Sequence, residues 1–107
     1  MSELGDVIDR LAVTIASRRG ADPAASWSAR LIADPHLAAK KLAEEAVEAA
    51  LAAVSGDRPA LIAESADLVY HLLALLEASH ISLDSLAAEL RRREGVSGIA
   101  EKATRGA

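Results

Sequence analysis

Two long stretches rich in alanine and leucine constrain the fold of this chain more than any other feature. Asp34 and Pro35 are typical of an N-cap followed by proline at the first helical position, and predict a helix to about residue 55. Gly56 and Asp57 end that helix and begin a second one, which runs to about residue 79. No segment shows a sustained two-residue alternation, so strands are not expected. The sequence predicts an all-α helical bundle whose two long central helices, joined by a tight turn, are antiparallel.

Shorter elements are predicted on either side of this pair. Apolar residues at helical spacing indicate the helices, and Gly20 and Pro23 mark a loop between the first two. The predicted elements are a helix over residues 3–18, a short helix or turn over residues 27–33, a helix from the N-cap Ser82 to about Gly95, and a C-terminal tail over residues 97–107. By its length, the chain (1–107) is expected to form a single domain.

The composition limits how this core is built. Aromatic residues make up only 2% of the chain and phenylalanine is absent, so the core must consist of Leu, Ile, Val and Ala. Small apolar side chains allow helices to pack closely, but each buries less area at roughly 25 cal/mol per Å². We therefore expect oligomerisation to complete the core.

Charge and cysteine content exclude several classes of function. The net charge of −4 argues against general nucleic-acid binding, which requires a basic surface. The chain has no cysteine and hence no disulfide, thiolate zinc site or cysteine nucleophile. No run approaches 18 uninterrupted apolar residues, and the N-terminus does not resemble a signal peptide. These features predict a soluble cytoplasmic protein with no nucleic-acid or membrane partner.

Five carboxylates in two clusters indicate the function. Glu44, Glu45 and Glu48 form an E-E-x-x-E run in the first long helix, and Glu64 and Asp67 form an E-x-x-D pair in the second. Residues three and four apart share a helix face, so two packed helices would bring these oxygens together. Like charges that close repel unless a cation lies between them. A hard cation with oxygen ligands, such as Mg²⁺, is the expected occupant, and Mg²⁺ commonly binds polyphosphates.

The helical positions of the first cluster suggest a cleft. Glu44 and Glu48 fall on the same stripe as Leu37 and Leu51, where an apolar core face would otherwise continue, and Glu45 lies at the edge of that stripe. An uncompensated carboxylate on a core face costs several kcal/mol. We therefore expect these acids to line a cleft.

On the second helix, Glu64 flanks a broad apolar face and Asp67 lies further round. The simpler interpretation of any one of these acids is a solvated surface residue. Two acid clusters on consecutive helices, with members on or beside the apolar stripes, favour a site.

Two lysines precede the first cluster by one helical turn. Lys40 and Lys41 could form salt bridges with Glu44 and Glu45, or could bind phosphate oxygens that a metal leaves free.

Further candidates for substrate binding lie in the loop and the tail. Arg18 and Arg19 could neutralise the end of the first helix or bind phosphate, and Lys102 and Arg105 could contribute to a second anion patch. Trp27 could be a packing residue or could stack on a base.

Several segments resemble a known family, and they span nearly the whole chain in the order that the family shows. They are residues 17–23 (SRRGADP), 26–31 (SWSARL), 40–48 (KKLAEEAVE), 64–73 (ESADLVYHLL) and 97–103 (SGIAEKA). The acid pattern resembles the all-α nucleotide pyrophosphohydrolase (MazG-like) superfamily. The loop and the tail resemble the phosphoribosyl-ATP pyrophosphohydrolase family within it. Trp27 and Ser28 stand where that family usually has Tyr and Thr, which preserves an aromatic ring and a hydroxyl.

The resemblance implies a homodimer that hydrolyses the α–β phosphoanhydride of phosphoribosyl-ATP in histidine biosynthesis. It implies Mg²⁺ bound by Glu45, Glu48, Glu64 and Asp67, with Glu44 orienting or deprotonating the attacking water. These roles could be exchanged among the five acids. It also implies that the substrate is bound by the basic and aromatic candidates Arg18, Arg19, Trp27, Lys40, Lys41, Lys102 and Arg105.

Two alternatives remain open from the sequence. A housekeeping nucleoside triphosphate pyrophosphohydrolase would use the same acids, so only the loop and the tail argue against it. A non-catalytic helical interaction module would leave the acids on the surface.

Overall fold

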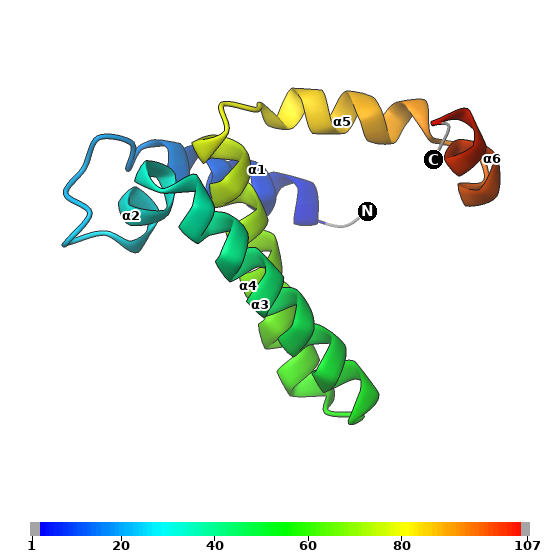
Figure 1. Cartoon of the computed structure of the whole chain (residues 1–107), viewed down its shortest axis with the longest axis horizontal. Helices are drawn as coiled ribbons and strands as arrows, with labels where there is room; N and C mark the ends of the chain where they lie inside the picture. Colours follow the sequence, from blue (N-terminus) through cyan, green and yellow to red (C-terminus); the bar gives the residue numbers. More distant parts are fainter. Residues whose placement is uncertain (1–2, 106–107) are drawn as a thin grey trace.

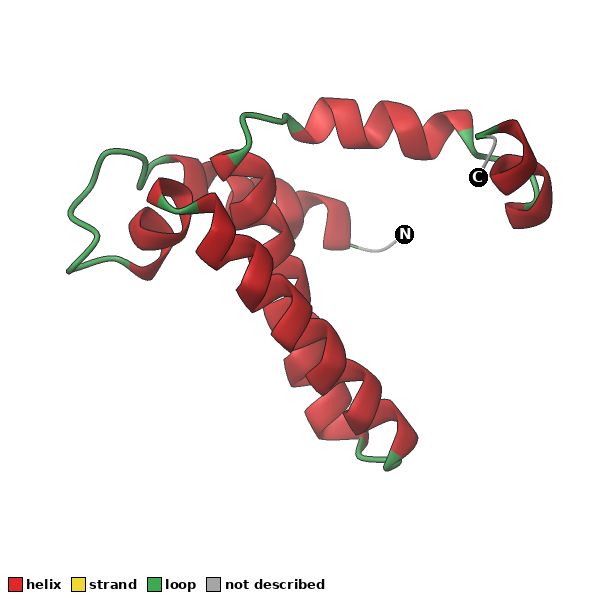
Figure 2. Cartoon of the chain, viewed as in Figure 1, coloured by secondary structure: helices red, strands yellow, loops and turns green. Residues whose placement is uncertain are grey.

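The computed structural model describes residues 3–105, and these residues contain helices and no strand, which confirms the all-α class (Figures 1 and 2). The helices are α1 (Leu4–Ala16), α2 (Trp27–Ala33), α3 (Pro35–Val54), α4 (Arg58–Ala78), α5 (Leu83–Arg92) and α6 (Gly98–Thr104). Residues 106 and 107 of the predicted tail lie outside the described residues.

The helices α3 and α4 lie side by side as a long antiparallel hairpin (Figure 1). The Asp34 side chain accepts a hydrogen bond from the backbone N–H of Leu37 at the start of α3, and Asp57 accepts one from Ala60 at the start of α4. Between the two helices, Gly56 has φ of +75°, a conformation that glycine adopts without strain. Local capping therefore sets both helix boundaries where the sequence predicted them.

The hydrophobic core lies at one end of this hairpin, where α1 and α2 pack against α3 and α4. Ile15 of α1 and Leu31 of α2 have almost no exposed surface. Ala38 of α3 and Leu73 and Ala74 of α4 complete the contact. The core is aliphatic, as the composition requires, and its main cluster lies at the end of the hairpin away from Gly56.

The helices α5 and α6 extend away from this core (Figure 1). Ser82 caps α5 by accepting a hydrogen bond from Ser85, as predicted, yet α5 contains no buried residue. The sequence prediction placed no helix after residue 95. Ser97 accepts a hydrogen bond from the N–H of Ala100 and begins the two-turn helix α6. So short a helix with few apolar residues leaves little periodic pattern in the sequence.

By length and composition alone, α4 is apolar enough to cross a membrane. In its most apolar 18-residue stretch, 17% is buried. The core helix of a soluble protein passes the same test. The helix α4 packs along α3 and carries Glu64, Asp67 and His71. The absence of a membrane partner stays a prediction.

Candidate metal and phosphate site

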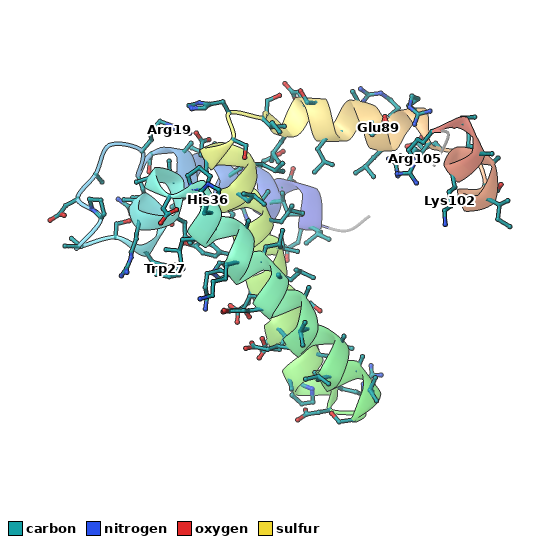
Figure 3. The ribbon with its side chains drawn as sticks, viewed as in Figure 1. Arg19, Trp27, His36, Glu89, Lys102 and Arg105 are labelled. Carbon is teal, nitrogen blue, oxygen red and sulfur yellow. The ribbon has the colours of Figure 1, made fainter. Side chains whose placement is uncertain are left out.

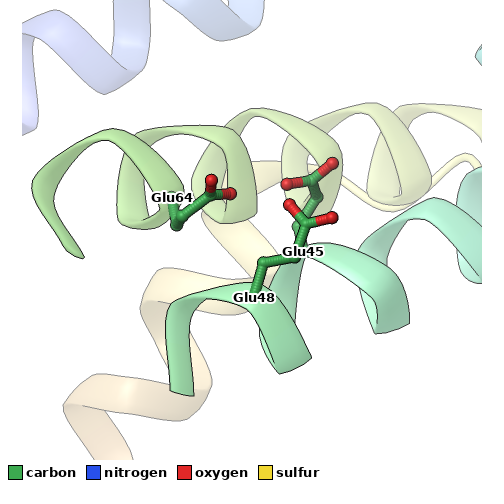
Figure 4. A group of neighbouring side chains, drawn as sticks. All are labelled: Glu45, Glu48 and Glu64. Atoms are coloured by element: carbon green, nitrogen blue, oxygen red, sulfur yellow. The ribbon is translucent and has the colours of Figure 1, made fainter. Parts of the chain in front are cut away.

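Three of the five predicted carboxylates meet between the two long helices. Glu45 and Glu48 project from α3 and Glu64 projects from α4, and the three side chains point toward one another (Figure 4). One carboxylate oxygen from each lies within 4.8 Å of the others. The antiparallel hairpin brings together residues on either side of the Gly56 turn, so the predicted juxtaposition of the two clusters occurs in the fold.

The orientation of α3 differs from the prediction. Its buried residues are Ala38, Glu45, Ala49 and Ala52. This stripe is the predicted one shifted by a single residue, which corresponds to a rotation of about 100° around the helix axis. Glu45, with 8% of its surface exposed, is therefore the buried acid, whereas Glu48 is exposed and Glu44 is only partly buried. The prediction that Glu44 and Glu48 occupy the core stripe was wrong.

The reason for the rotation is the size of the side chains. Alanines at positions 38, 49 and 52 allow α3 to approach α4 closely, whereas a leucine such as Leu51 would hold the axes apart. Leu51 is 63% exposed as a result. Hydrophobicity alone favoured the leucine stripe, and close packing selected the alanine stripe.

Two oxygens in the cluster lack hydrogen-bond partners. Glu45 Oε2 and Glu64 Oε2 are both buried and accept no hydrogen bond from the protein. When Glu64 is protonated, its carboxyl group can donate a hydrogen bond to Glu48. That hydrogen bond, burial, and the nearby Glu45 raise the pKa of Glu64 from 4.5 to about 7. Without a metal ion, Glu64 therefore binds a proton near neutral pH.

The donor set fits a hard divalent cation. Carboxylate oxygens are ligands that Mg²⁺ prefers, at about 2.0–2.1 Å, so two ligands of one ion lie at most about 4.2 Å apart. The oxygens of Glu45, Glu48 and Glu64 are close to that spacing, and two of these residues carry buried oxygens with no other partner. A cation bound here would satisfy both oxygens and cancel the repulsion.

Glu44 and Lys41 form an ion pair at the edge of the cluster. Lys41 Nζ donates to Glu44 Oε2 at 2.9 Å, with an i,i+3 spacing in place of the i,i+4 pairs that the sequence suggested. This hydrogen bond lowers the pKa of Glu44 and raises that of Lys41. Lys40 is exposed on the same turn of α3. A shallow hollow lined by Ala43, Glu44, Val47 and Glu48 opens beside this edge.

Asp67 lies outside the group of three. Asp67 is exposed. Its backbone carbonyl accepts a hydrogen bond at 2.8 Å from the ring of His71, one turn further along α4. The predicted role of Asp67 as a metal ligand therefore stays a prediction. It requires the Asp67 side chain to reach the cluster from the surface of α4.

Two side-chain contacts that the sequence did not predict join α2 to α4. The indole N–H of Trp27 donates to Nε2 of His71 at 3.2 Å, and Ser28 shares a hydrogen bond with Tyr70. The sequence offered adjacent pairs, Trp27-Ser28 and Tyr70-His71, as the only signal. Their partnership depends on how α2 folds back against α4.

The other predicted binding residues are spread over the chain. Arg19 forms a hydrogen-bonded ion pair with Glu77 at 2.7 Å and also donates to its backbone carbonyl. Glu77 lies 13 residues from Glu64, or about 20 Å along α4. Arg19 is therefore engaged far from the acid cluster, and Arg18 is exposed in the same turn.

Lys102 and Arg105 lie at the end of the molecule opposite Trp27, on and just after α6 (Figure 3). Within one chain they do not reach the hairpin.

Comparison with known proteins places these residues in a family. A family model described as phosphoribosyl-ATP pyrophosphohydrolase matches residues 8–94, which include all five carboxylates. A protein named phosphoribosyl-ATP pyrophosphatase from Caulobacter vibrioides (strain NA1000 / CB15N) is 61% identical over 102 residues, covering 95% of each chain. Proteins of the same name from Caulobacter sp. (strain K31) and Cereibacter sphaeroides (strain ATCC 17025 / ATH 2.4.3) are 57% and 55% identical and cover 98% and 94% of this chain, respectively, and 98% of their own lengths.

Proposed function

Because the chain belongs to the phosphoribosyl-ATP pyrophosphohydrolase family, we propose that it hydrolyses phosphoribosyl-ATP to phosphoribosyl-AMP and pyrophosphate. Water attacks and breaks the α–β phosphoanhydride in this reaction, which is the second step of histidine biosynthesis. The observation that carries the proposal is the match to named relatives over nearly the whole chain. The convergence of Glu45, Glu48 and Glu64 supplies the matching chemistry.

We assign metal binding to the carboxylate cluster. Glu45, Glu48 and Glu64 would hold Mg²⁺, and Asp67 would complete the set from the surface of α4. The bound cation would supply Lewis-acid stabilisation of the phosphate oxygens as negative charge develops. Glu64 must lose its proton for this role, since a protonated carboxyl group is a poor ligand.

The residues beside the cluster orient the water and the phosphates. Glu44, which Lys41 keeps ionised, is the candidate for orienting or deprotonating the attacking water. Lys40 and Lys41 would balance the phosphate charge that the cation leaves. Trp27 is 41% exposed, and the adenine base could stack on its indole. Arg18 is the second candidate for balancing that phosphate charge, whereas Arg19 would first have to leave its ion pair with Glu77.

A homodimer would cover the apolar surfaces that one chain leaves open. Leu90 on α5, Val54 on α3 and Ile62 on α4 are exposed, and α5 has no buried residue. A hollow lined largely by apolar residues lies between α1, α4 and the start of α5. Lys102 and Arg105 lie far from the hairpin of their own chain, so a role in substrate binding would require those of a second copy. We propose that the enzyme is a soluble cytoplasmic homodimer.

A turnover assay tests the proposal. Pyrophosphate release from phosphoribosyl-ATP is measured with and without Mg²⁺, beside ordinary nucleoside triphosphates at the same concentrations. The proposal predicts Mg²⁺-dependent release that is fastest with phosphoribosyl-ATP and is lost in Glu48→Gln. Preference for the ordinary nucleotides would assign the chain to the housekeeping alternative. Absence of turnover and of Mg²⁺ binding would favour the interaction module.

A further inference from the structure

We propose that His71 is a positioning residue for the reaction, which holds the indole of Trp27 at the base-binding side of the site. The inference rests on the proposed function, because it assumes that Trp27 contacts the substrate. His71 is not part of the acid cluster and has 6% of its surface exposed. Both of its ring nitrogens have partners, on two different elements.

The two partners determine the hydrogen positions on the ring. The Asp67 carbonyl oxygen can only accept, so Nδ1 of His71 must carry a hydrogen and donate it at 2.8 Å. The indole N–H of Trp27 can only donate, so Nε2 must be the unprotonated acceptor at 3.2 Å. The arrangement therefore selects one neutral tautomer, which joins α2 to the backbone carbonyl of Asp67, itself a proposed metal ligand.

The contact also fixes which part of the indole remains available. The Trp27 N–H is used by His71, so the indole would recognise a base by its π-face and not by a hydrogen bond. The guanidinium of Arg30 lies over the Trp27 ring, 5.8 Å from its centroid. The ring of His71 contacts the indole edge-on, with 72° between the two ring planes. Trp27 is held on its polar edge while part of its surface stays open.

The position of His71 on α4 connects this edge to the chemistry. Glu64 and His71 are seven residues apart, which places them within about 20° on the same face of α4 and about 10 Å apart along its axis. The centroid of the Trp27 ring lies 6.4 Å from that of His71, and in the proposal one nucleotide extends from the cluster, past His71, to this indole. His71 therefore sets where the base is held relative to the cation.

Matched substitutions separate positioning from packing. His71→Gln retains an amide oxygen close to the position of Nε2, which can accept from Trp27, whereas His71→Asn is too short to reach the indole. Tyr70→Phe removes the neighbouring hydrogen bond to Ser28 and leaves the Trp27 contact intact. Trp27 is the only tryptophan in the chain, so its fluorescence reports this contact directly.

The expected result is a split between KM and kcat. In His71→Asn, KM for phosphoribosyl-ATP should rise about threefold to tenfold, because one net hydrogen bond is lost. The kcat should stay within about twofold of wild type. Its tryptophan emission maximum should shift, while His71→Gln and Tyr70→Phe keep the wild-type KM and emission. Combining His71→Asn with Trp27→Phe should raise KM no further than Trp27→Phe alone.

Three outcomes would overturn this role. One is a His71→Asn protein that melts at a lower temperature but keeps the wild-type KM and emission, which would make His71 a packing residue only. Another is a double variant whose effects simply add. The third is a His71→Gln protein as impaired as His71→Asn. A wild-type protein without activity on phosphoribosyl-ATP refutes the proposed function itself, and the emission data then still show whether the His71 contact exists.

Discussion

The two ends of the α3–α4 hairpin use the same pair of helices in opposite ways. At the end that packs against α1 and α2, Ala38 meets Leu73 and Ala74 in an aliphatic core. Toward the Gly56 turn, Glu45 faces Glu64 between the helices, and Ile62 is 71% exposed. Burial of apolar side chains at the first end stabilises the fold. At the second end, like charges lie close together and repel.

The difference shows where stability and function are located. The core end holds α1 and α2 in place without any ligand. The acid end is strained by its own charges until a cation or a proton binds, so its carboxylates are available as ligands. Substitutions at the two ends should therefore change different measurements.

The largest effect is expected from Glu45→Gln at the acid end. Loss of a buried ligand should reduce kcat/KM by about 100-fold to 1,000-fold, while the metal-free protein should melt at the same or a higher temperature because a buried charge is removed. Steady-state assays and thermal melts check both parts. Glu94→Gln, which changes an exposed glutamate, is the control and should leave both unchanged. A Glu45→Gln protein that is unstable yet active would contradict the comparison.

At the core end, Leu31→Ala should destabilise the protein by about 2–5 kcal/mol, because Leu31 has no exposed surface and its removal leaves a cavity. Leu51→Ala at the acid end is the matched substitution. Because Leu51 is exposed, this change should lower the free energy of unfolding of a monomer by about 0.5 kcal/mol or less. Urea unfolding measures both. A large effect at Leu51 would show that a second copy covers the acid half in solution.

The arm formed by α5 tests whether a second copy is present. Leu86→Asp places a charge on the apolar face of an amphipathic helix that has no buried residue. If this face contacts a partner chain, the dissociation constant of the dimer should rise by about tenfold or more. Sedimentation velocity across a dilution series measures it, with Arg91→Gln as a control on the same helix. An unchanged assembly state would remove α5 from the interface.

The smallest effect is a pH dependence of Mg²⁺ binding. Because the pKa of Glu64 is about 7, a proton competes with the cation below that pH, and affinity should fall by roughly tenfold from pH 7.5 to pH 6. The folded-state pKa lies above the ordinary value, so proton binding stabilises the metal-free fold fully below pH 4.5, and this contribution is lost as pH rises through 7. Calorimetry in buffers of different ionisation enthalpy measures the released proton. Glu64→Gln should abolish the pH dependence.

The helix boundaries were largely predictable because local chemistry sets them. Asp34, Asp57 and Ser82 each accept a backbone hydrogen bond at a helix start, and Gly56 adopts the left-handed conformation expected at the turn. The short helix α6 was missed because its cap at Ser97 is followed by few apolar residues. Local signals therefore predicted every element that has both a cap and an apolar stripe.

The members of the site were predictable, but their arrangement was not. Spacing in the sequence identified all five carboxylates, and three of them meet. It could not identify Glu45 as the buried member, because that depends on how α3 is rotated against α4. It also gave no pairing for Trp27 and His71, which lie 44 positions apart in the chain.

The sequence by itself determined that this chain is helical, that a tight turn separates its two longest helices, and that their acids call for a cation. These follow from capping, periodicity and charge, which act over a few residues. Only the tertiary structure decided which acid is buried, which stripe of α3 faces α4, and that His71 holds Trp27. Those outcomes depend on close packing between helices, since a rotation of about 100° changes every partner while leaving the local helix unchanged.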